Sequence, residues 1–265
     1  MNNNKSLNCR LCEEKANLVF NKKILNKFIV NYYKCSKCES LQTEKPYWLD
    51  EAYSRSNLCD DDLGAAYRTL RNHEKVFILS KILKVNKGLD WGAGDGLLCR
   101  LLRDYKLNFF SSDKYSLPKY SSKFIISDFN NLDLIVSFEV FEHMSEPNNE
   151  IDFLFNKEPN SVFISTMFYN NNEKNWYYLH PDSGMHVFFY SKKSIEMIAK
   201  KYNYHVYFFD NQYALFYKKN YISTLKLKII NFFFNKYMTK LIRMYLTILP
   251  VKGIEKDKKY LPNGD

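Results

Sequence analysis

The chain has 265 residues and a formal net charge of +10, enough for one medium-sized domain with appendages. No apolar run is as long as a membrane span. The charge is uneven, because 11 of the 39 basic but only 3 of the 29 acidic residues follow residue 217, which leaves residues 1–217 with a net charge of +2. The body of the chain therefore lacks the basic surface that is typical of nucleic-acid-binding proteins.

The first predicted element, residues 1–45, is a zinc-binding module. Its two C-x-x-C pairs, Cys9 with Cys12 and Cys35 with Cys38, are separated by 22 residues. Four thiolates at this spacing suit a closed tetrahedral zinc site with a structural role, and iron is the alternative metal. Disulfides are less expected, because residues 1–6 hold no apolar signal-peptide core and the chain should stay in a reducing cytoplasm.

A helical connector or lid is expected next, over residues 46–85. Its apolar residues from Leu63 to Leu83 recur at helical spacing. The segment after it, residues 86–218, carries the densest set of motifs in the chain. We expect it to form a separate domain.

A glycine-rich loop opens this domain. Gly92, Gly94 and Gly96 stand between a short extended run and a helical pattern that starts at Leu97. A strand, a glycine loop and a helix let backbone N–H groups approach a ligand, and the N-terminus of the helix favours a negative group. The spacing differs from the G-x-G-x-x-G of dinucleotide-binding loops. An ordinary turn between a strand and a helix is the alternative.

Several apolar runs after the loop predict strands, at residues 107–113, 123–129, 132–139 and 161–166. A helix capped by Ser191 or Ser194 follows, and then a hairpin over residues 205–217. Strands that alternate with helices predict an α/β fold. We expect a doubly wound, Rossmann-like, mostly parallel sheet with a terminal antiparallel hairpin, preceded by the small zinc module.

The motif D-x-G-x-G-x-G, which starts at Asp90, and the segment S-F-E-V-F-E-H at residues 137–143 resemble class I S-adenosylmethionine (SAM) dependent methyltransferases. The resemblance implies an enzyme that uses SAM. In this family the glycine loop holds the methionine end of SAM. The resemblance further implies that Asp113 binds the ribose and that Asp128 contacts adenine. The implied cofactor-binding residues are Asp90, Gly92, Gly94, Gly96, Asp113 and Asp128.

The same resemblance places Glu142 and His143 beside the methyl group. We expect His143 to be the general base of methyl transfer and Glu142 to orient it or to contact the substrate. His186 is the rival base. Gly88, at a position where the family usually has a bulky apolar residue, departs from the pattern. A SAM-binding scaffold without turnover is therefore an alternative.

A long aromatic loop, residues 176–191, resembles a "W-x-Y…G-x-H-x-x-F-x-S" stretch of some methyltransferases from glycan clusters. The four-cysteine module resembles that of methyltransferases that act on nucleotide-linked sugars and surface-glycan precursors. Both imply a small acceptor, a nucleotide- or lipid-linked sugar of polysaccharide biosynthesis. The loop could instead be a satellite hydrophobic cluster.

Methylation of RNA, with the zinc module gripping the nucleic acid, is the alternative within the enzyme class. The fourth strand ends in Ser-Phe-Glu and not in the Asn/Asp-Pro-Pro-aromatic motif of base amino-group methylases, and no Pro-Cys pair is present to attack a pyrimidine. We therefore expect no sequence-specific nucleic acid partner.

The tail, residues 219–265, is basic. Its apolar residues at helical spacing are Leu227, Ile230, Phe234, Met238, Leu241, Tyr245 and Ile248. A basic amphipathic helix predicts peripheral contact with the inner, anionic face of the membrane. Packing on the catalytic domain or on a second subunit is the alternative, and the oligomeric state stays open.

Overall fold

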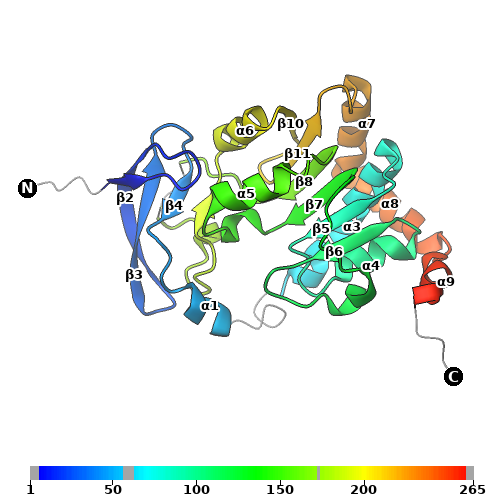
Figure 1. Cartoon of the computed structure of the whole chain (residues 1–265), viewed down its shortest axis with the longest axis horizontal. Coiled ribbons are helices and arrows are strands. Elements are labelled where there is room, and N and C mark those ends of the chain that lie inside the picture. The colour runs from blue at the N-terminus through cyan, green and yellow to red at the C-terminus, as the bar shows by residue number, and fades with distance from the viewer. Residues whose placement is uncertain (1–5, 56–62, 172–173, 261–265) are drawn as a thin grey trace, which may run out of the picture. The chain divides into compact units, whose positions relative to one another are not determined.

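The computed structural model describes residues 6–55, 63–171 and 174–260 (Figure 1). The chain forms two compact units that alternate along the sequence. The first contains residues 1–63, 139–156 and 165–214, and the second contains residues 64–138, 157–164 and 215–265. Each unit is described by itself below.

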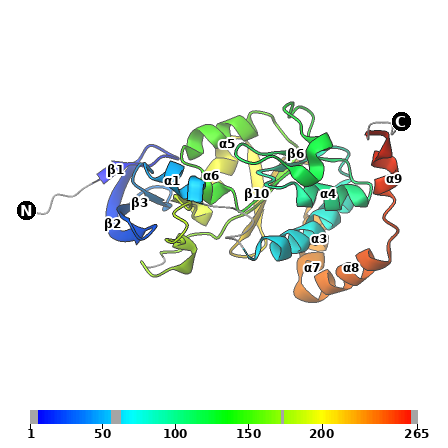
Figure 2. The same cartoon turned by 90° about the horizontal axis from the view of Figure 1, so that it is seen from below.

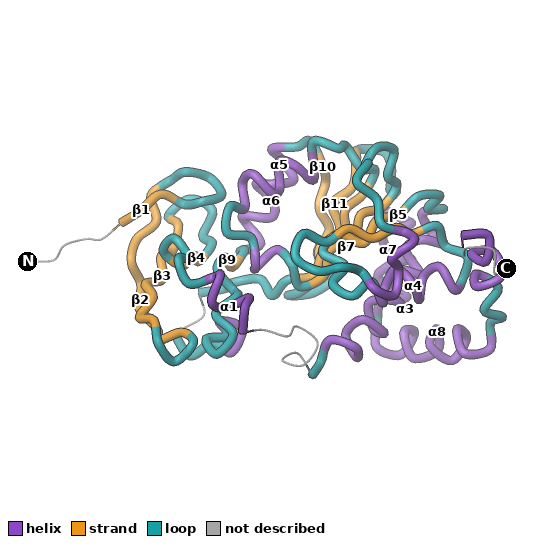
Figure 3. Tube along the Cα trace, turned by 60° about the horizontal axis from the view of Figure 1, so that its bottom comes forward, coloured by secondary structure: helices purple, strands orange, loops and turns teal. Residues whose placement is uncertain are grey.

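The first unit contains a five-stranded sheet with the order β1-β2-β3-β4-β9, whose neighbouring strands are all antiparallel (Figure 3). Its strands are β1 (Ser6–Asn8), β2 (Lys15–Ile24), β3 (Phe28–Cys35), β4 (Leu41–Thr43) and β9 (Phe188–Phe189). Leu25 and Asn26 both have positive φ, 52° and 53°, which the tight turn between β2 and β3 requires. The last strand, β9, belongs to the predicted aromatic loop, so this loop completes the sheet of the cysteine module.

The first unit also contains several short helices. They are α1 (Leu49–Arg55), α5 (Pro147–Phe155), α6 (Lys192–Lys201) and the 3-10 turns η2 (Phe141–His143) and η3 (Tyr177–Leu179). The Ser191 hydroxyl accepts a hydrogen bond from the Ser194 backbone N–H at 3.0 Å, so Ser191 is the cap of α6 and Ser194 is not. A buried cluster that includes Tyr32, Trp48 and Phe189 forms the core.

The larger sheet has six strands in the order β10-β11-β8-β7-β5-β6. Their bounds are β5 (Gly88–Trp91), β6 (Phe109–Ser112), β7 (Leu134–Phe138), β8 (Ser161–Ser165), β10 (Tyr204–Phe208) and β11 (Tyr213–Lys218). Strand β5 pairs in parallel with both β6 and β7. Only residues 209–212 join β10 to β11, and so short a connection requires an antiparallel pair. The predicted α/β fold with a mostly parallel sheet is confirmed.

One predicted strand, residues 123–129, is wrong. A 3-10 helix, η1 (Lys119–Phe124), occupies its start, and a single parallel bridge between Ser111 and Ile125 is its only pairing among the described residues. The backbone turns because Pro118 accepts from the Ser121 N–H, and the Ser121 hydroxyl is 2.7 Å from that of Ser111. The apolar run therefore meets β6 at a single bridge and forms no strand.

The helices of the second unit are α3 (Ala65–Leu83), α4 (Leu97–Asp104), α7 (Thr224–Phe234), α8 (Lys236–Ile248), α9 (Gly253–Asp257) and the 3-10 turn η4 (Lys258–Tyr260). Helices α7 and α8 pack against α3 (Figure 2). No helix in the described part of the chain is long and apolar enough to cross a membrane.

The predicted amphipathic helix of the tail is divided into two helices, α7 and α8. Asn235 has extended backbone angles, and its side chain accepts from the N–H groups of Tyr237 and Met238, which caps α8. The predicted stripe is therefore divided. Leu227 and Ile230 on α7 are buried, whereas Leu241, Tyr245 and Ile248 on α8 are 55%, 51% and 78% exposed.

Candidate functional site

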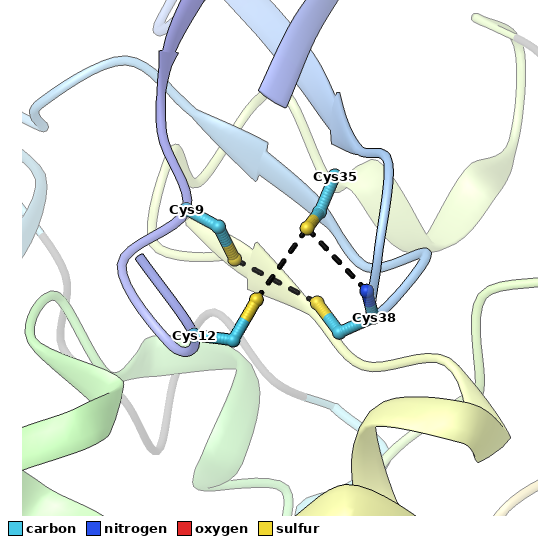
Figure 4. Close-up of side chains that lie close together, drawn as sticks. All are labelled: Cys9, Cys12, Cys35 and Cys38. Atoms are coloured by element: carbon cyan, nitrogen blue, oxygen red, sulfur yellow. Dashed lines mark hydrogen bonds between the residues drawn. The ribbon is translucent and has the colours of Figure 1, made fainter. Parts of the chain in front are cut away.

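The cysteine cluster lies at the end of the five-stranded sheet, where Cys9, Cys12, Cys35 and Cys38 point toward a common centre (Figure 4). All four are free thiols. The Sγ atoms of Cys9 and Cys38 are 3.6 Å apart, and those of Cys12 and Cys35 are 3.5 Å apart. Tetrahedral ligands at a zinc–sulfur distance of roughly 2.3 Å are about 3.8 Å apart, so the donor set and its spacing fit the predicted ion. The backbone N–H groups of Lys37 and Cys38 also donate to the Cys35 sulfur, the outer bonding expected of a metal ligand.

Arg10, between Cys9 and Cys12, connects this cluster to two other segments of the first unit. Its guanidinium donates to the carbonyl of Ser145 at 2.9 Å and to that of Val187 at 2.6 Å. Burial lowers the pKa of Arg10 to about 10, so the group is still charged at neutral pH. The two accepting carbonyls lie close in sequence to His143 and His186. Nothing in the C-x-x-C pattern pointed to this role.

The glycine loop of the second unit forms as predicted between β5 and α4. Gly92, Gly94 and Gly96 all have positive φ, at 78°, 56° and 81°. A side chain on Gly96 would come within 2.2 Å of the Ser121 hydroxyl. Positive φ therefore favours glycine at all three positions. At Gly94 no atom lies within 4 Å of where a Cβ would stand, so the backbone there is open to close approach by a ligand.

Asp113, directly after β6, is bonded to that loop. Its Oδ2 accepts from the Gly94 N–H at 2.8 Å, and its Oδ1 accepts from the N–H groups of Tyr115 and Ser116 at 2.8 and 2.7 Å. Three backbone donors fix the carboxylate beside the loop. A carboxylate oxygen can accept two hydrogen bonds, so Oδ2 retains capacity for a ligand hydroxyl.

Asp90, at the end of β5, is a buried acid. Burial, and then the charges of Asp113 and Asp95, raise its pKa to about 8. Its Oδ2 has no hydrogen-bond partner among the described residues. Asp128, by contrast, is exposed and follows the segment that is not a strand.

The predicted catalytic residues of the first unit come together. The ligand atoms of Glu142, His143 and His186 lie within 4.8 Å of one another. The two imidazole rings are 4.9 Å apart at 87°. Glu142 and His143 belong to η2, and the loop before β9 supplies His186.

Glu142 is fully buried, and burial, followed by the charge of Glu139, raises its pKa to about 8. Burial, followed by the charges of His186 and His180, holds the pKa of His143 well below its usual range. The His143 imidazole is therefore neutral at pH 7.

Two further residues, Tyr178 and Glu139, complete this group, and neither is among the predicted site residues. The Tyr178 hydroxyl is 2.6 Å from Glu142 Oε1 and 3.0 Å from Glu139 Oε2. Glu139 also accepts from Ser165 and Gln212. Tyr178 belongs to the aromatic loop and Glu139 to the S-F-E-V-F-E-H segment, so each lies in a motif of the sequence, although neither motif shows that the two side chains meet.

A family model described as "Methyltransferase domain" matches residues 65–207. No curated protein matches the chain. Among solved structures, the chain is similar to the methyltransferase domain of the bacterial protein CtHen1, with 22% identity, 56% of this chain and 97% of that chain covered and a TM-score of 0.41.

It is also similar to magnesium protoporphyrin IX methyltransferase from Synechocystis PCC 6803 with bound SAH, with 12% identity, 66% and 96% covered and a TM-score of 0.47. An O-methyltransferase family protein from Burkholderia thailandensis has 12% identity, 64% and 62% covered and a TM-score of 0.49. The family model covers more than half of the chain, and the chain therefore belongs to the methyltransferase-domain family.

Proposed function

We propose that this methyltransferase takes its methyl group from SAM, bound at the glycine loop. The observation that carries the proposal is the bond from the Gly94 N–H to Asp113, which sets a carboxylate beside a loop open to close approach. Gly92, Gly94 and Gly96 would hold the methionine moiety, and Asp113 would accept from the ribose. Asp90 and Asp128 are the further candidates for SAM contacts.

We propose that Glu142, His143 and His186 serve the acceptor. The chain passes directly from β7 to Glu139, and the carboxyl ends of parallel strands such as β5 and β7 lie at one edge of a sheet. In the reaction the acceptor oxygen or carbon loses a proton to an imidazole and attacks the methyl carbon. The S–CH₃ bond breaks, its electron pair stays on sulfur, and S-adenosylhomocysteine leaves. His143 is the first choice of base and His186 the second.

The acceptor that we propose is a nucleotide- or lipid-linked sugar, or a related glycan precursor. Aromatic side chains stack on sugar faces, and Tyr177 in the aromatic loop is 69% exposed. Residues 1–217 have a net charge of only +2, which does not favour RNA.

The test is a turnover assay with isotopically labelled SAM and a panel of nucleotide sugars, with total RNA as a separate acceptor. S-adenosylhomocysteine and a labelled sugar are the expected products, and His143→Ala should lower turnover by ~100- to 10,000-fold without changing SAM affinity. Labelled RNA would favour the alternative enzyme. SAM binding without product from any acceptor would favour the scaffold.

We propose zinc as the ion of the cysteine cluster, with Cys9, Cys12, Cys35 and Cys38 as its ligands. Four thiolates leave no open coordination position, so zinc would stabilise the fold and take no part in the chemistry. We call Glu142, His143 and His186 the acceptor group. Zinc would affect the acceptor group through Arg10, which donates hydrogen bonds to backbone carbonyls in the two segments that carry these residues.

We also propose that α8 contacts an anionic membrane surface. One face of α8 exposes Tyr237, Leu241, Met244, Tyr245 and Ile248. Lys236 and Lys240 are exposed beside it. An exposed apolar face with flanking lysines suits the interface of an anionic bilayer.

We predict that the protein floats with acidic liposomes at low salt and less in high salt, because counterions screen the lysines. Leu241→Asp should weaken flotation without lowering the melting temperature, since Leu241 is more than half exposed. Equal recovery with neutral liposomes would favour protein packing at this face instead.

A further inference from the structure

Three side chains of the first unit are arranged as ligands of a metal ion. Glu142 and His143 stand on η2, His186 stands before β9, and their ligand atoms lie within 4.8 Å of one another. We propose that Glu142, His143 and His186 bind a divalent first-row transition-metal ion, at a second metal site distinct from the cysteine cluster. Bonds of about 2.1 Å to each ligand would bring the three atoms to roughly 3.4 Å from one another in a tetrahedral site.

The outer bonding of His186 fits a ligand. Its Nδ1 lies 2.7 Å from the carbonyl oxygen of Tyr178, and because a carbonyl can only accept, Nδ1 carries the hydrogen. Nε2 then carries the lone pair with which imidazole binds metals. Metal-binding histidines are regularly fixed in this way, by a bond from the other ring nitrogen to a carbonyl or carboxylate.

Glu142 supplies a second, independent observation. Its side chain is fully buried, yet its Oε2 has no hydrogen-bond partner within the described part of the chain. A buried polar atom left unpaired is costly, and such atoms often mark the place of an ion or a water. The pairing of Oε1 with Tyr178 orients the carboxyl group and leaves Oε2 for a ligand.

The electrostatics also point to a cation. Glu139 and Glu142 share the Tyr178 hydroxyl, which has one hydrogen for two carboxyl groups. The other hydrogen bonds to Glu139 come from Ser165 and Gln212, which are neutral. A divalent ion at Glu142 would supply the positive charge that this pair of acids needs.

The ligand set indicates which metals fit. One carboxylate and two imidazoles suit Mn²⁺, Fe²⁺, Co²⁺ or Zn²⁺, whereas four thiolates select zinc. The two sites therefore differ in chemistry, and a hard ion such as Mn²⁺ should prefer the site of Glu142, His143 and His186 to the cysteine cluster.

The consequence for catalysis rests on the proposed function. An acceptor hydroxyl bound to the cation would have a lowered pKa and would give its proton to water before its oxygen attacks the methyl carbon. His143 and His186 would then act as ligands and not as the base.

The experiment is an electron paramagnetic resonance titration of the full-length protein with Mn²⁺, in which binding removes the signal of the free ion. We expect one Mn²⁺ per chain. His186→Ala and Glu142→Gln should each weaken binding at least tenfold. His205→Ala is the matched control, because His205 is an exposed histidine of the same unit outside the group, and it should bind Mn²⁺ normally.

No Mn²⁺ binding, or equal binding by the wild type and both variants, would overturn the proposal. Circular dichroism and SAM affinity serve as folding controls, and if Glu142→Gln does not fold, His186→Ala alone decides. Mn²⁺ binding that is weakened in both variants supports the metal site, whether or not any acceptor is methylated. Failure to methylate any acceptor would count against the proposed function and not against the metal site. Full turnover after removal of the ion would overturn its catalytic role.

Discussion

Asp113 has two tasks at the scale of the single residue, since it fixes the glycine loop and, in our proposal, binds the ribose of SAM. We predict that Asp113→Ala lowers SAM affinity at least tenfold, because each lost hydrogen bond to a charged group contributes about 1.5–3 kcal/mol. Asp113→Asn, which keeps one acceptor oxygen, should lose less. Asp182→Ala, at an exposed aspartate, is the control. Calorimetric affinity unchanged in Asp113→Ala would exclude this role.

Asp90 should make stability depend on pH. Its pKa of about 8 in the folded protein lies above the value of roughly 3.9 in an unfolded chain. Between these values the folded state holds a proton that the unfolded state has released, so the free energy of unfolding falls as pH rises and levels off above pH 8.

We therefore predict that the melting temperature falls between pH 6 and pH 9, and that it falls less in Asp90→Asn. The substitution keeps the size of the side chain and removes the buried charge. Identical pH profiles for the wild type and the variant, measured by circular dichroism, would show that Asp90 does not hold a proton in the folded state.

At the scale of the element, the short helix α9 is bound to α4 by a buried ion pair. Asp257 accepts from Arg103 Nη2 at 2.7 Å and from its Nε at 2.9 Å, and Arg100 Nη2 is 2.9 Å from the same carboxylate. The Arg103 guanidinium also stacks on Phe124 at 3.5 Å. Loss of the carboxylate would leave a buried cation without its counter-charge.

We predict that Asp257→Ala lowers the free energy of unfolding by about 3 kcal/mol, the lower end of the cost of breaking a buried pair. Urea denaturation measures the change. Lys259→Ala, at an exposed lysine two residues later, is the matched control and should unfold like the wild type. A loss below about 1 kcal/mol in Asp257→Ala would mean that α9 is not held by this pair.

Strand β5 explains why Gly88 departs from the family pattern. A Cβ at Gly88 would lie 2.4 Å from the ring of Phe109, its partner on β6. The bulky side chain that the fold needs at this place comes from the neighbouring strand, and Phe109 is fully buried. The glycine at position 88 suggested a scaffold without turnover. In the structure it only makes room for the large side chain of Phe109 on the neighbouring strand.

At the scale of the whole molecule, the cysteine cluster and the acceptor group are joined through Arg10. We predict that metal analysis finds zinc at the cluster and that Cys35→Ser loses it. The variant should lose turnover while SAM affinity is retained, because the glycine loop belongs to the other unit. Cys99→Ser, at a buried cysteine outside the cluster, is the control for loss of a thiol. Normal turnover in a zinc-free variant would show that the cluster does not position the acceptor group.

The sequence predicted the parts of this protein that have strict local signatures. The glycine loop, the cysteine pairs and most strands have fixed spacings or periods, and the structure places them where expected. Residues 123–129 failed because an apolar run cannot reveal that Ser111 and Ser121 pair at a sheet edge. Arg10 and Tyr178 were missed because their partners are 135 and 36 residues away, and no local pattern records such contacts.

The pairing of β9 with β4 has a consequence for the history of this enzyme. Gln42 and Leu41 of the cysteine module face Phe188 and Phe189, which follow His186 almost directly. A module that shares a sheet with the aromatic loop cannot be exchanged by recombination without altering that loop. Across relatives, substitutions at residues 41–43 and 187–189 should therefore be correlated, and acceptor preference should be inherited together with the amino-terminal module.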